Sequence, residues 1–178
     1  MSEVTTFRSL LTEVSDLRDA DHWQQQSIAE LPKQISEQDT AAFAAIEQVA
    51  VIGSGAMGRC IAIAFARLGK QVTVIDASED ALQAALTFIT GYVAGQQKKG
   101  KLSDEAALEF QARFEFAAEL DAIAGCGLVV EAVPEILSLK QQVMQQLAER
   151  VSADCILATN TSTLDLDAIA DAVPNPER

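Results

Sequence analysis

The sequence predicts an α/β fold with a doubly wound parallel sheet, and two patterns lead to this prediction. From residue 48 onward, short apolar runs alternate with longer helical stretches. Apolar runs of this length are typical of strands that are buried on both faces of a sheet. A glycine-rich turn joins the first run to the first helical stretch. Repeated strand–helix–strand units place parallel strands side by side, with helices covering both faces.

Four apolar runs are the predicted strands, and they occupy residues 49–52, 72–75, 128–130 and 155–158. The predicted helices lie at 61–68, from after Ser78 through Phe88 towards Lys98, and at 137–150 and 164–172, with a further helix starting at Ser103. Ser78 precedes the second of these helices, where a hydroxyl can cap the free N–H groups. Gly69 follows the first helix, at the position where glycine commonly ends a helix.

Residues 1–47 differ in character from the rest, being polar and rich in glutamine. Leu10, Leu11, Val14 and Leu17 fall at helical spacing, and residues 41–46 suggest a second helical turn. We interpret this segment as a short helical N-terminal arm or linker without chemistry of its own. Residues 48–178 are then the second, sheet-containing domain.

The composition excludes several classes of partner. The formal net charge is −13 and the pI is about 4.3, so the phosphates of nucleic acid and an anionic membrane surface would be repelled. A phosphorylated ligand remains possible, because backbone N–H groups bind phosphate without Lys or Arg. The first residues lack the basic and apolar regions of a secretory signal, and three cysteines make no disulfide framework. We therefore expect a cytoplasmic protein.

The most informative motif is the turn Gly53-Ser54-Gly55-Ala56-Met57-Gly58, directly after the first predicted strand. Its first glycine permits the tight turn, the second lets the backbone approach a pyrophosphate, and the third lets the next helix pack closely. The N-terminus of that helix offers unpaired N–H groups and the positive end of its dipole to phosphates. The turn predicts a Rossmann-type dinucleotide site in which all six residues take part.

Asp76 ends the second predicted strand, about 20 residues beyond the turn, where dinucleotide-binding folds carry an acidic residue. Its carboxylate can accept hydrogen bonds from the hydroxyls of the adenosine ribose. The same charge would repel the 2′-phosphate of NADP, and no arginine follows closely. These features favour NAD as the cofactor, against the alternative that Asp76 merely caps a loop.

Four stretches carry a family resemblance, and they read VAVIGSGAMG at 49–58, LVVEAVPE at 128–135 with Lys140 after it, TNTSTL at 159–164 and PER at 176–178. Through them, the chain from about residue 48 to 178 resembles the NAD-binding domain of the 3-hydroxyacyl-CoA dehydrogenases. The resemblance implies NAD-dependent oxidation of (S)-3-hydroxyacyl-CoA to 3-oxoacyl-CoA, as in fatty acid β-oxidation, with acyl-CoA as the substrate of the full-length protein.

The resemblance also implies roles for individual residues. Val133, Glu135 and Lys140 lie beside the cofactor, with Glu135 and Lys140 near the nicotinamide ribose. Ser162 hydrogen-bonds the 3-oxygen of the substrate beside the nicotinamide and counts as both a catalytic and a cofactor-site residue. Lys99 is the nearest match to a lysine that contacts coenzyme A.

Each of three assignments has a plain structural alternative. Lys140 could be a solvated residue on an amphipathic helix. Ser162 could cap the following helix and form a capping box with Asp165. Lys99 could simply be a cation that is favourable at a helix C-terminus.

In the resembling family, a histidine accepts the proton of the 3-hydroxyl, and a carboxylate orients that histidine. The resemblance places this histidine in a strand just beyond residue 178, with the helical domain and its dimer interface further on. His22 precedes the first strand and cannot replace it. We therefore expect the C-terminal helical domain to be absent from these 178 residues. We also expect the chain to bind NAD without turning over acyl-CoA alone, and to form a homodimer only with that domain.

Two other functions stay open at this point. One is a 3-hydroxyisobutyrate-type β-hydroxyacid dehydrogenase, which shares the glycine turn but which Asp76 and Ser162 disfavour. The other is a non-catalytic dinucleotide-binding module whose N-terminal arm docks on a partner.

Overall fold

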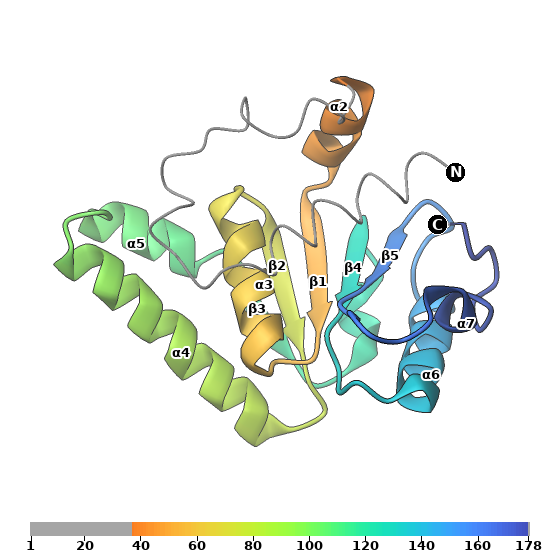
Figure 1. The fold of residues 1–178 in the computed structure, drawn as a ribbon. Helices are drawn as coiled ribbons and strands as arrows, with labels where there is room; N and C mark the ends of the chain where they lie inside the picture. The colour runs from red at the N-terminus through yellow and green to blue at the C-terminus, as the bar shows by residue number, and fades with distance from the viewer. Residues whose placement is uncertain (1–36, 178) are drawn as a thin grey trace.

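The computed structural model describes residues 37–177, with side chains described from residue 41 onward. The helix predicted around Leu10–Leu17 lies outside the described residues. The elements, shown in Figure 1, are α2 (Glu37–Ala45), β1 (Gln48–Ile52), α3 (Ala56–Arg67), β2 (Gln71–Ile75), α4 (Glu79–Lys98), α5 (Asp104–Gln111), β3 (Phe114–Ala117), the 3₁₀ helix η3 (Leu120–Ile123), β4 (Leu128–Glu131), α6 (Leu137–Ala148), β5 (Ile156–Thr159) and α7 (Leu166–Ala170).

The strands form one parallel sheet in the order β3-β2-β1-β4-β5, which confirms the doubly wound prediction. The order reverses between β1 and β4, and such a reversal opens a crevice at the carboxyl ends of the two strands. β3 was not predicted. Its four residues, FEFA, alternate apolar and acidic or small side chains at the edge of the sheet, so they form no continuous apolar run.

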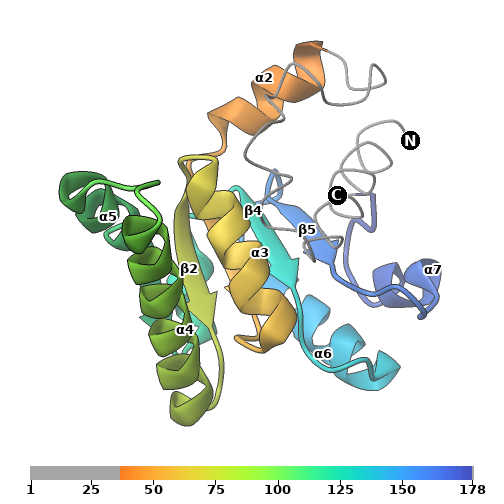
Figure 2. The same ribbon diagram turned by 60° about the vertical axis from the view of Figure 1, so that its left-hand side comes forward.

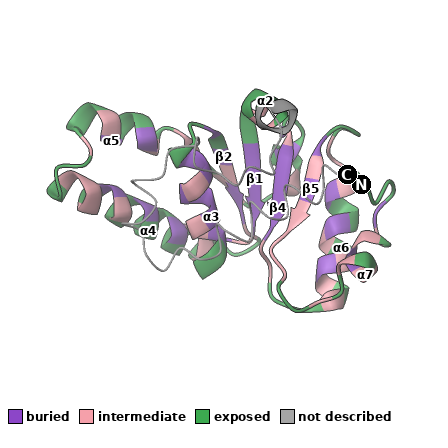
Figure 3. Cartoon of the chain, turned by 45° about the horizontal axis from the view of Figure 1, so that its top comes forward, coloured by how far each residue is buried: buried purple, intermediate pink, exposed green. Residues whose placement is uncertain are grey.

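Each face of the sheet is covered by its own core. Alternate strand residues point to opposite sides, so Val49 and Val51 join the cluster under α3 and α4, whereas Ala50 and Ile52 join the cluster under α6 and α7. Figure 2 shows α3 and α4 on one side of the sheet and α6 and α7 on the other. The buried residues in Figure 3 concentrate on β1, β4 and the inner sides of the helices. The result is a three-layer α/β/α domain.

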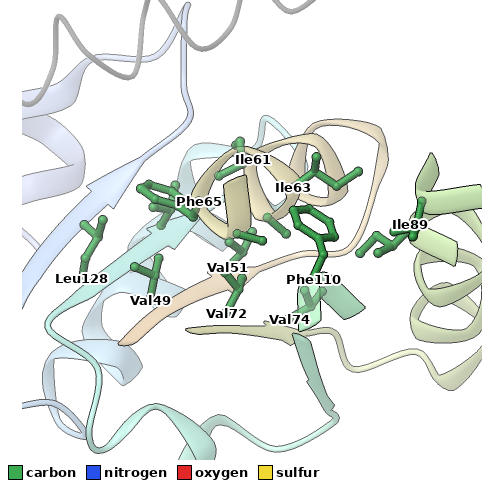
Figure 4. Packing of buried hydrophobic residues seen from close by; sticks show 14 of the residues in the cluster. Val49, Val51, Ile61, Ile63, Phe65, Val72, Val74, Ile89, Phe110 and Leu128 are labelled. Carbon is green, nitrogen blue, oxygen red and sulfur yellow. The ribbon is translucent and has the colours of Figure 1, made fainter. Parts of the chain in front are cut away.

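Helix α3 begins earlier than the periodicity predicted, at Ala56 rather than near Ile61. Its apolar side, with Ile61 and Phe65, lies on the valines of β1 and β2, as Figure 4 shows. Gly69 follows the helix with a φ of +85°, as expected for a glycine just past a helix end. The first helix of the sheet domain is therefore anchored closely against the strand that leads into the glycine turn.

Helices α4 and α5 form a pair that projects from one side of the sheet (Figures 1 and 3). The predicted cap is confirmed, because the hydroxyl of Ser78 accepts a hydrogen bond from the N–H of Ala81 at 3.2 Å. The 20 residues of α4 extend about 30 Å at the usual rise of a helix. Lys99, the C-cap of α4, therefore lies at the opposite end of this helix from Ser78 and away from the carboxyl edge of the sheet.

Helix α2 lies directly before the sheet domain and is attached to it. The ammonium of Lys70 donates hydrogen bonds to the backbone oxygens of Phe43, at 2.9 Å, and Ala44, at 3.2 Å. The same ammonium lies 4.5 Å from the centre of the Phe43 ring. Lys70 is only 8% exposed, and burial lowers the pKa of its side chain. The end of the predicted arm thus packs on the domain that follows.

Candidate functional site

The glycine turn lies at the carboxyl end of β1, directly beside the loop that follows β4. Gly53 has a φ of +99°, a conformation that side chains disfavour. A Cβ atom at this position would lie 2.7 Å from the backbone oxygen of Ala132, which is closer than real atoms approach. Only glycine therefore allows the two loops on either side of the sheet reversal to meet here.

The two other glycines of the turn have different surroundings. A Cβ on Gly58 would lie 1.8 Å from the oxygen of Gly53, so this glycine is needed for α3 to pack on the turn. A Cβ on Gly55 would meet no protein atom within 4 Å. Its side therefore faces open space, which is the condition that close approach of a pyrophosphate requires.

The N-terminus of α3 is left available for a ligand. Gly55 is its N-cap residue, no side chain caps it, and no acidic residue stands in its first turn. The N-termini of α4, α5 and α7 are each capped by a side chain. The uncapped N–H groups and positive dipole end of α3 are suited to bind phosphate groups. Met57, in this first turn, is 38% exposed beside them.

Asp76 meets the glycine turn from the end of β2. Its Oδ2 atom accepts hydrogen bonds from the backbone N–H of Ser54, at 2.8 Å, and from the Ser54 hydroxyl, at 2.9 Å. Its Oδ1 atom accepts from the N–H of Ser78 at 3.0 Å. Partial burial opposes ionisation of Asp76, but these hydrogen bonds outweigh it and lower the pKa of the carboxyl. A carboxylate is therefore fixed beside the turn in its charged form.

Glu135 and Lys140 come together on the other side of the sheet reversal. The Nζ atom of Lys140 lies 3.3 Å from Oε2 of Glu135. The other carboxylate oxygen, Oε1, accepts hydrogen bonds from the hydroxyls of Thr161 and Thr163, the latter at 3.1 Å. The bond from Thr161 is the largest cause that brings the pKa of Glu135 down to about 2, against a smaller opposing effect of desolvation. Lys140 and Thr163 lower it further.

The alternative that Lys140 is a solvated residue is wrong, because its side chain is completely buried. It forms an ion pair with Glu131, a residue that sequence reasoning did not single out. Nζ lies 2.7 Å from Oε1 of Glu131, whose side chain is also completely buried. A signal existed in the sequence: Lys140 interrupts the apolar side of α6, and Glu131 ends an otherwise apolar strand. Two opposite charges at core positions indicate a buried pair.

Val133 lies between this pair and the glycine turn. Its N–H donates to Oε1 of Glu131 at 2.6 Å, and its backbone oxygen accepts from Nζ of Lys140 at 3.1 Å. The loop after β4 is therefore held by charged groups beneath it.

Ser162 stands between the two threonines that bind Glu135. Its side chain is exposed and makes no hydrogen bond with the described part of the chain. The alternative that it caps the last helix is wrong. Asp165 caps α7 by accepting from the N–H of Asp167 at 3.0 Å. The N–H of Leu164 donates to the hydroxyl of Thr161 at 3.1 Å. The hydroxyl of Ser162 is thus left available at the carboxyl edge of the sheet.

The structure does not bring Lys99 to this cluster, since it lies at the far end of α4. A ligand that contacts both Ser162 and Lys99 would have to be extended. Within the described residues, no group of three or more histidine, cysteine or carboxylate side chains could hold a metal ion. None of the described helices is long and apolar enough to cross a membrane.

The open side of Gly55, the uncapped N-terminus of α3 and the fixed charge of Asp76 fit the pyrophosphate and ribose of a dinucleotide. Residues 48–178 match the family described as "3-hydroxyacyl-CoA dehydrogenase, NAD binding domain". The chain belongs to the 3-hydroxyacyl-CoA dehydrogenase family. Its cofactor class is NAD, and this membership disfavours the 3-hydroxyisobutyrate-type alternative.

Known members of the 3-hydroxyacyl-CoA dehydrogenase family are similar over most of this chain. The 3-hydroxyadipyl-CoA dehydrogenase of Escherichia coli K12 is 38% identical over 133 residues, which are 75% of this chain and 28% of that protein. The glyoxysomal fatty acid beta-oxidation multifunctional protein of Brassica napus is 33% identical over 133 residues, which are 75% of this chain and 18% of that protein.

A solved structure agrees with this likeness. The crystal structure of 3-hydroxybutyryl-CoA dehydrogenase from Escherichia coli K12 superposes with a TM-score of 0.72 and 38% identity, covering 74% of this chain and 28% of that one. The chain therefore spans less than a third of each of these three relatives. Their shared part is the sheet domain described above.

Proposed function

We propose that these 178 residues bind NAD(H) in the crevice between the glycine turn and the loop after β4. The observation that carries the proposal is the contact of Asp76 with Ser54, which fixes a carboxylate beside the open glycine turn. In this assignment, residues 53–58 hold the pyrophosphate and Asp76 accepts the ribose hydroxyls. Glu135 and Val133 line the nicotinamide side. Lys140 is fully covered, so it supports the cofactor site by holding Glu131 and Glu135.

The whole protein, we propose, oxidises (S)-3-hydroxyacyl-CoA to 3-oxoacyl-CoA in fatty acid β-oxidation. When bound, NAD supplies the hydride acceptor for this reaction. In this proposal the exposed hydroxyl of Ser162 hydrogen-bonds the 3-oxygen of the substrate. Lys99, at the far end of α4, would contact the coenzyme A part of the substrate. The similarity to the Brassica napus fatty acid beta-oxidation protein supports this reaction class.

Other properties of the whole protein are proposed with the reaction. The general base and the homodimer interface come from sequence outside these 178 residues, and the protein acts in the cytoplasm. The second candidate function is a non-catalytic NAD-binding module. A reading frame that stops directly after Arg178 would favour this second candidate, whereas a frame that continues into a helical domain would favour the dehydrogenase.

The test is a calorimetric titration of the chain with NADH and with NADPH, repeated with Asp76→Asn. We expect the chain to prefer NADH, because Asp76 accepts from the ribose hydroxyls and repels a 2′-phosphate. Hydrogen bonds to charged groups contribute about 1.5–3 kcal/mol. The substitution should therefore weaken NADH binding by roughly ten- to a hundredfold and reduce the preference over NADPH.

The matched control is Asp154→Asn, which removes an exposed carboxylate in the turn before β5. This variant should bind NADH like the unmodified chain. If the unmodified chain is folded by circular dichroism and binds neither dinucleotide, the proposed function is wrong. Equal affinity of the unmodified chain for NADH and NADPH would refute only the role of Asp76 and would leave the proposed dinucleotide site in place.

A further inference from the structure

The buried pair of Glu131 and Lys140 is the most densely bonded polar group in the described part of the chain. Oε1 of Glu131 accepts from Nζ of Lys140 at 2.7 Å and from the N–H of Val133 at 2.6 Å. Oε2 accepts from the same Nζ at 3.0 Å and from the hydroxyl of Thr159 at 2.5 Å. Both side chains are completely shielded from solvent. Every oxygen of the carboxylate is therefore used.

This pair connects segments that are distant in the sequence. Glu131 ends β4, Lys140 lies in α6 and Thr159 ends β5. The connection continues to the surface, because Lys140 also contacts Glu135 at 3.3 Å. Glu135 in turn binds the hydroxyls of Thr161 and Thr163, on both sides of Ser162. A chain of charged contacts thus leads from the core to the segment that carries the free hydroxyl.

Stability alone gives no sufficient reason for such a pair. Removing two charges from water is costly, and apolar side chains of similar volume often stabilise a core as well or better. An apolar pair would make no hydrogen bonds to the loop after β4 and no ion pair with Glu135. The charged pair makes both and therefore fixes the orientation of that loop and of Glu135. The other half of the site is held separately, since Asp76 contacts only Ser54 and Ser78 among the described side chains and N–H groups.

We propose that Glu131 is a positioning residue for the nicotinamide half of the site: through Lys140 and Glu135 it fixes the segment that carries Ser162. This inference rests on the NAD-binding function proposed above. Glu131 itself touches no ligand, because it is fully buried. No hydrogen bond joins Glu131 to Asp76 or Ser54, in the adenosine half of the site.

The test compares two ligands, NADH and ADP, which lacks both the nicotinamide and its ribose. Both are titrated calorimetrically into the unmodified chain and into Glu131→Gln, which keeps the shape but removes the charge. We expect NADH binding to weaken by about tenfold or more, as for a lost charged hydrogen bond. ADP binding should stay within about threefold, the range of a surface substitution. A merely structural defect would weaken both ligands alike.

A second variant addresses the danger that a single substitution unfolds the core. The double substitution Glu131→Leu with Lys140→Met replaces the pair by apolar side chains and leaves no charge buried alone. We expect it to stay folded and to show the same selective loss of NADH binding. The matched control is Glu149→Gln, whose carboxylate is 66% exposed, and this variant should bind both ligands normally.

Hydrogen exchange of the backbone gives a readout without any ligand. In Glu131→Gln, the amides of residues 160–164 should exchange faster, whereas those of β1 and α3 should not change. Equal weakening of both ligands, or no weakening of either, would overturn the proposal. If the unmodified chain binds neither ligand, the function proposed above is wrong, and hydrogen exchange alone then tests the positioning role of Glu131. Faster exchange at residues 160–164 in Glu131→Gln would support that role, and unchanged exchange would refute it.

Discussion

The three glycines of the turn share one motif but have three different physical roles. Gly53 is required by its positive φ and its contact with Ala132, and Gly58 by its contact with Gly53. Gly55 has no protein neighbour that requires it. Two glycines are therefore required by the fold, while the third leaves open space in which we propose that the pyrophosphate binds.

A substitution at Gly58 tests this division. A Cβ atom there would lie 1.8 Å from the backbone oxygen of Gly53, and a backbone atom cannot move aside cheaply. We expect Gly58→Ala to lower the free energy of unfolding by about 1–3 kcal/mol, measured by urea denaturation. Unchanged stability would contradict the close packing of α3 on the turn.

Two other glycines supply the controls. Gly91 lies on the exposed side of α4 with nothing within 4 Å of its Cβ position. Gly91→Ala should raise the free energy of unfolding by about 0.5–1 kcal/mol, as is usual inside a helix. Gly55→Ala should keep the chain folded but weaken NADH binding.

At the scale of elements, one lysine attaches α2 to the sheet domain. Lys70 stands between α3 and β2, and its ammonium binds the last carbonyl groups of α2. A cation at this end of a helix is favourable, because the unpaired carbonyl oxygens are negative there. The side chain of Lys70 thus holds the C-terminal end of α2 on the sheet domain.

Lys70→Met removes these contacts and keeps most of the aliphatic volume. We expect the free energy of unfolding to fall by about 1–3 kcal/mol, the contribution of hydrogen bonds from a charged group. Amide exchange in residues 41–45 should become faster, while exchange in β1 stays slow. Lys98→Met, at the exposed end of α4, is the control and should change stability by less than about 0.5 kcal/mol. Slow exchange of α2 in Lys70→Met would show that Phe43 and Ile46 alone hold the helix.

The whole molecule carries a net charge of −13 yet presents a site for a doubly charged pyrophosphate. The parts of the described site that would meet the phosphates are backbone N–H groups of α3 and the open side of Gly55. A helix N-terminus provides a local positive field that does not depend on the net charge. A strongly negative net charge is therefore compatible with binding of a dinucleotide.

The residues available in these 178 positions also lead to a prediction about catalytic activity. The described residues include no histidine, since His22 is the one histidine of the sequence and lies outside them. Ser162 alone offers a hydrogen bond but no general base. We expect the purified chain to show no NADH oxidation with acetoacetyl-CoA above a heated control, followed at the absorbance of NADH. Oxidation that heating abolishes would contradict this prediction.

Local signals in the sequence were enough to determine the first strand, the glycine turn, the body of α3 but not its start, Asp76 and the cap at Ser78. Each depends on residues that are neighbours along the chain or on the periodicity of one element. The family resemblance likewise drew on short runs around Glu135 and Ser162.

Only the tertiary structure decided how the second half of the site is built. β3 is a strand because β2 offers its edge to Phe114–Ala117, and no apolar run announces it. Lys140 is buried because Glu131, nine residues earlier, meets it from another element. Thr161 and Thr163 bind Glu135 across 26 and 28 residues of chain, which leaves Ser162 free. The sequence pattern can indicate that Glu131 and Lys140 are charges at core positions. Which groups contact each other across distant segments depends on the path of the chain in space, so the partners followed from the fold.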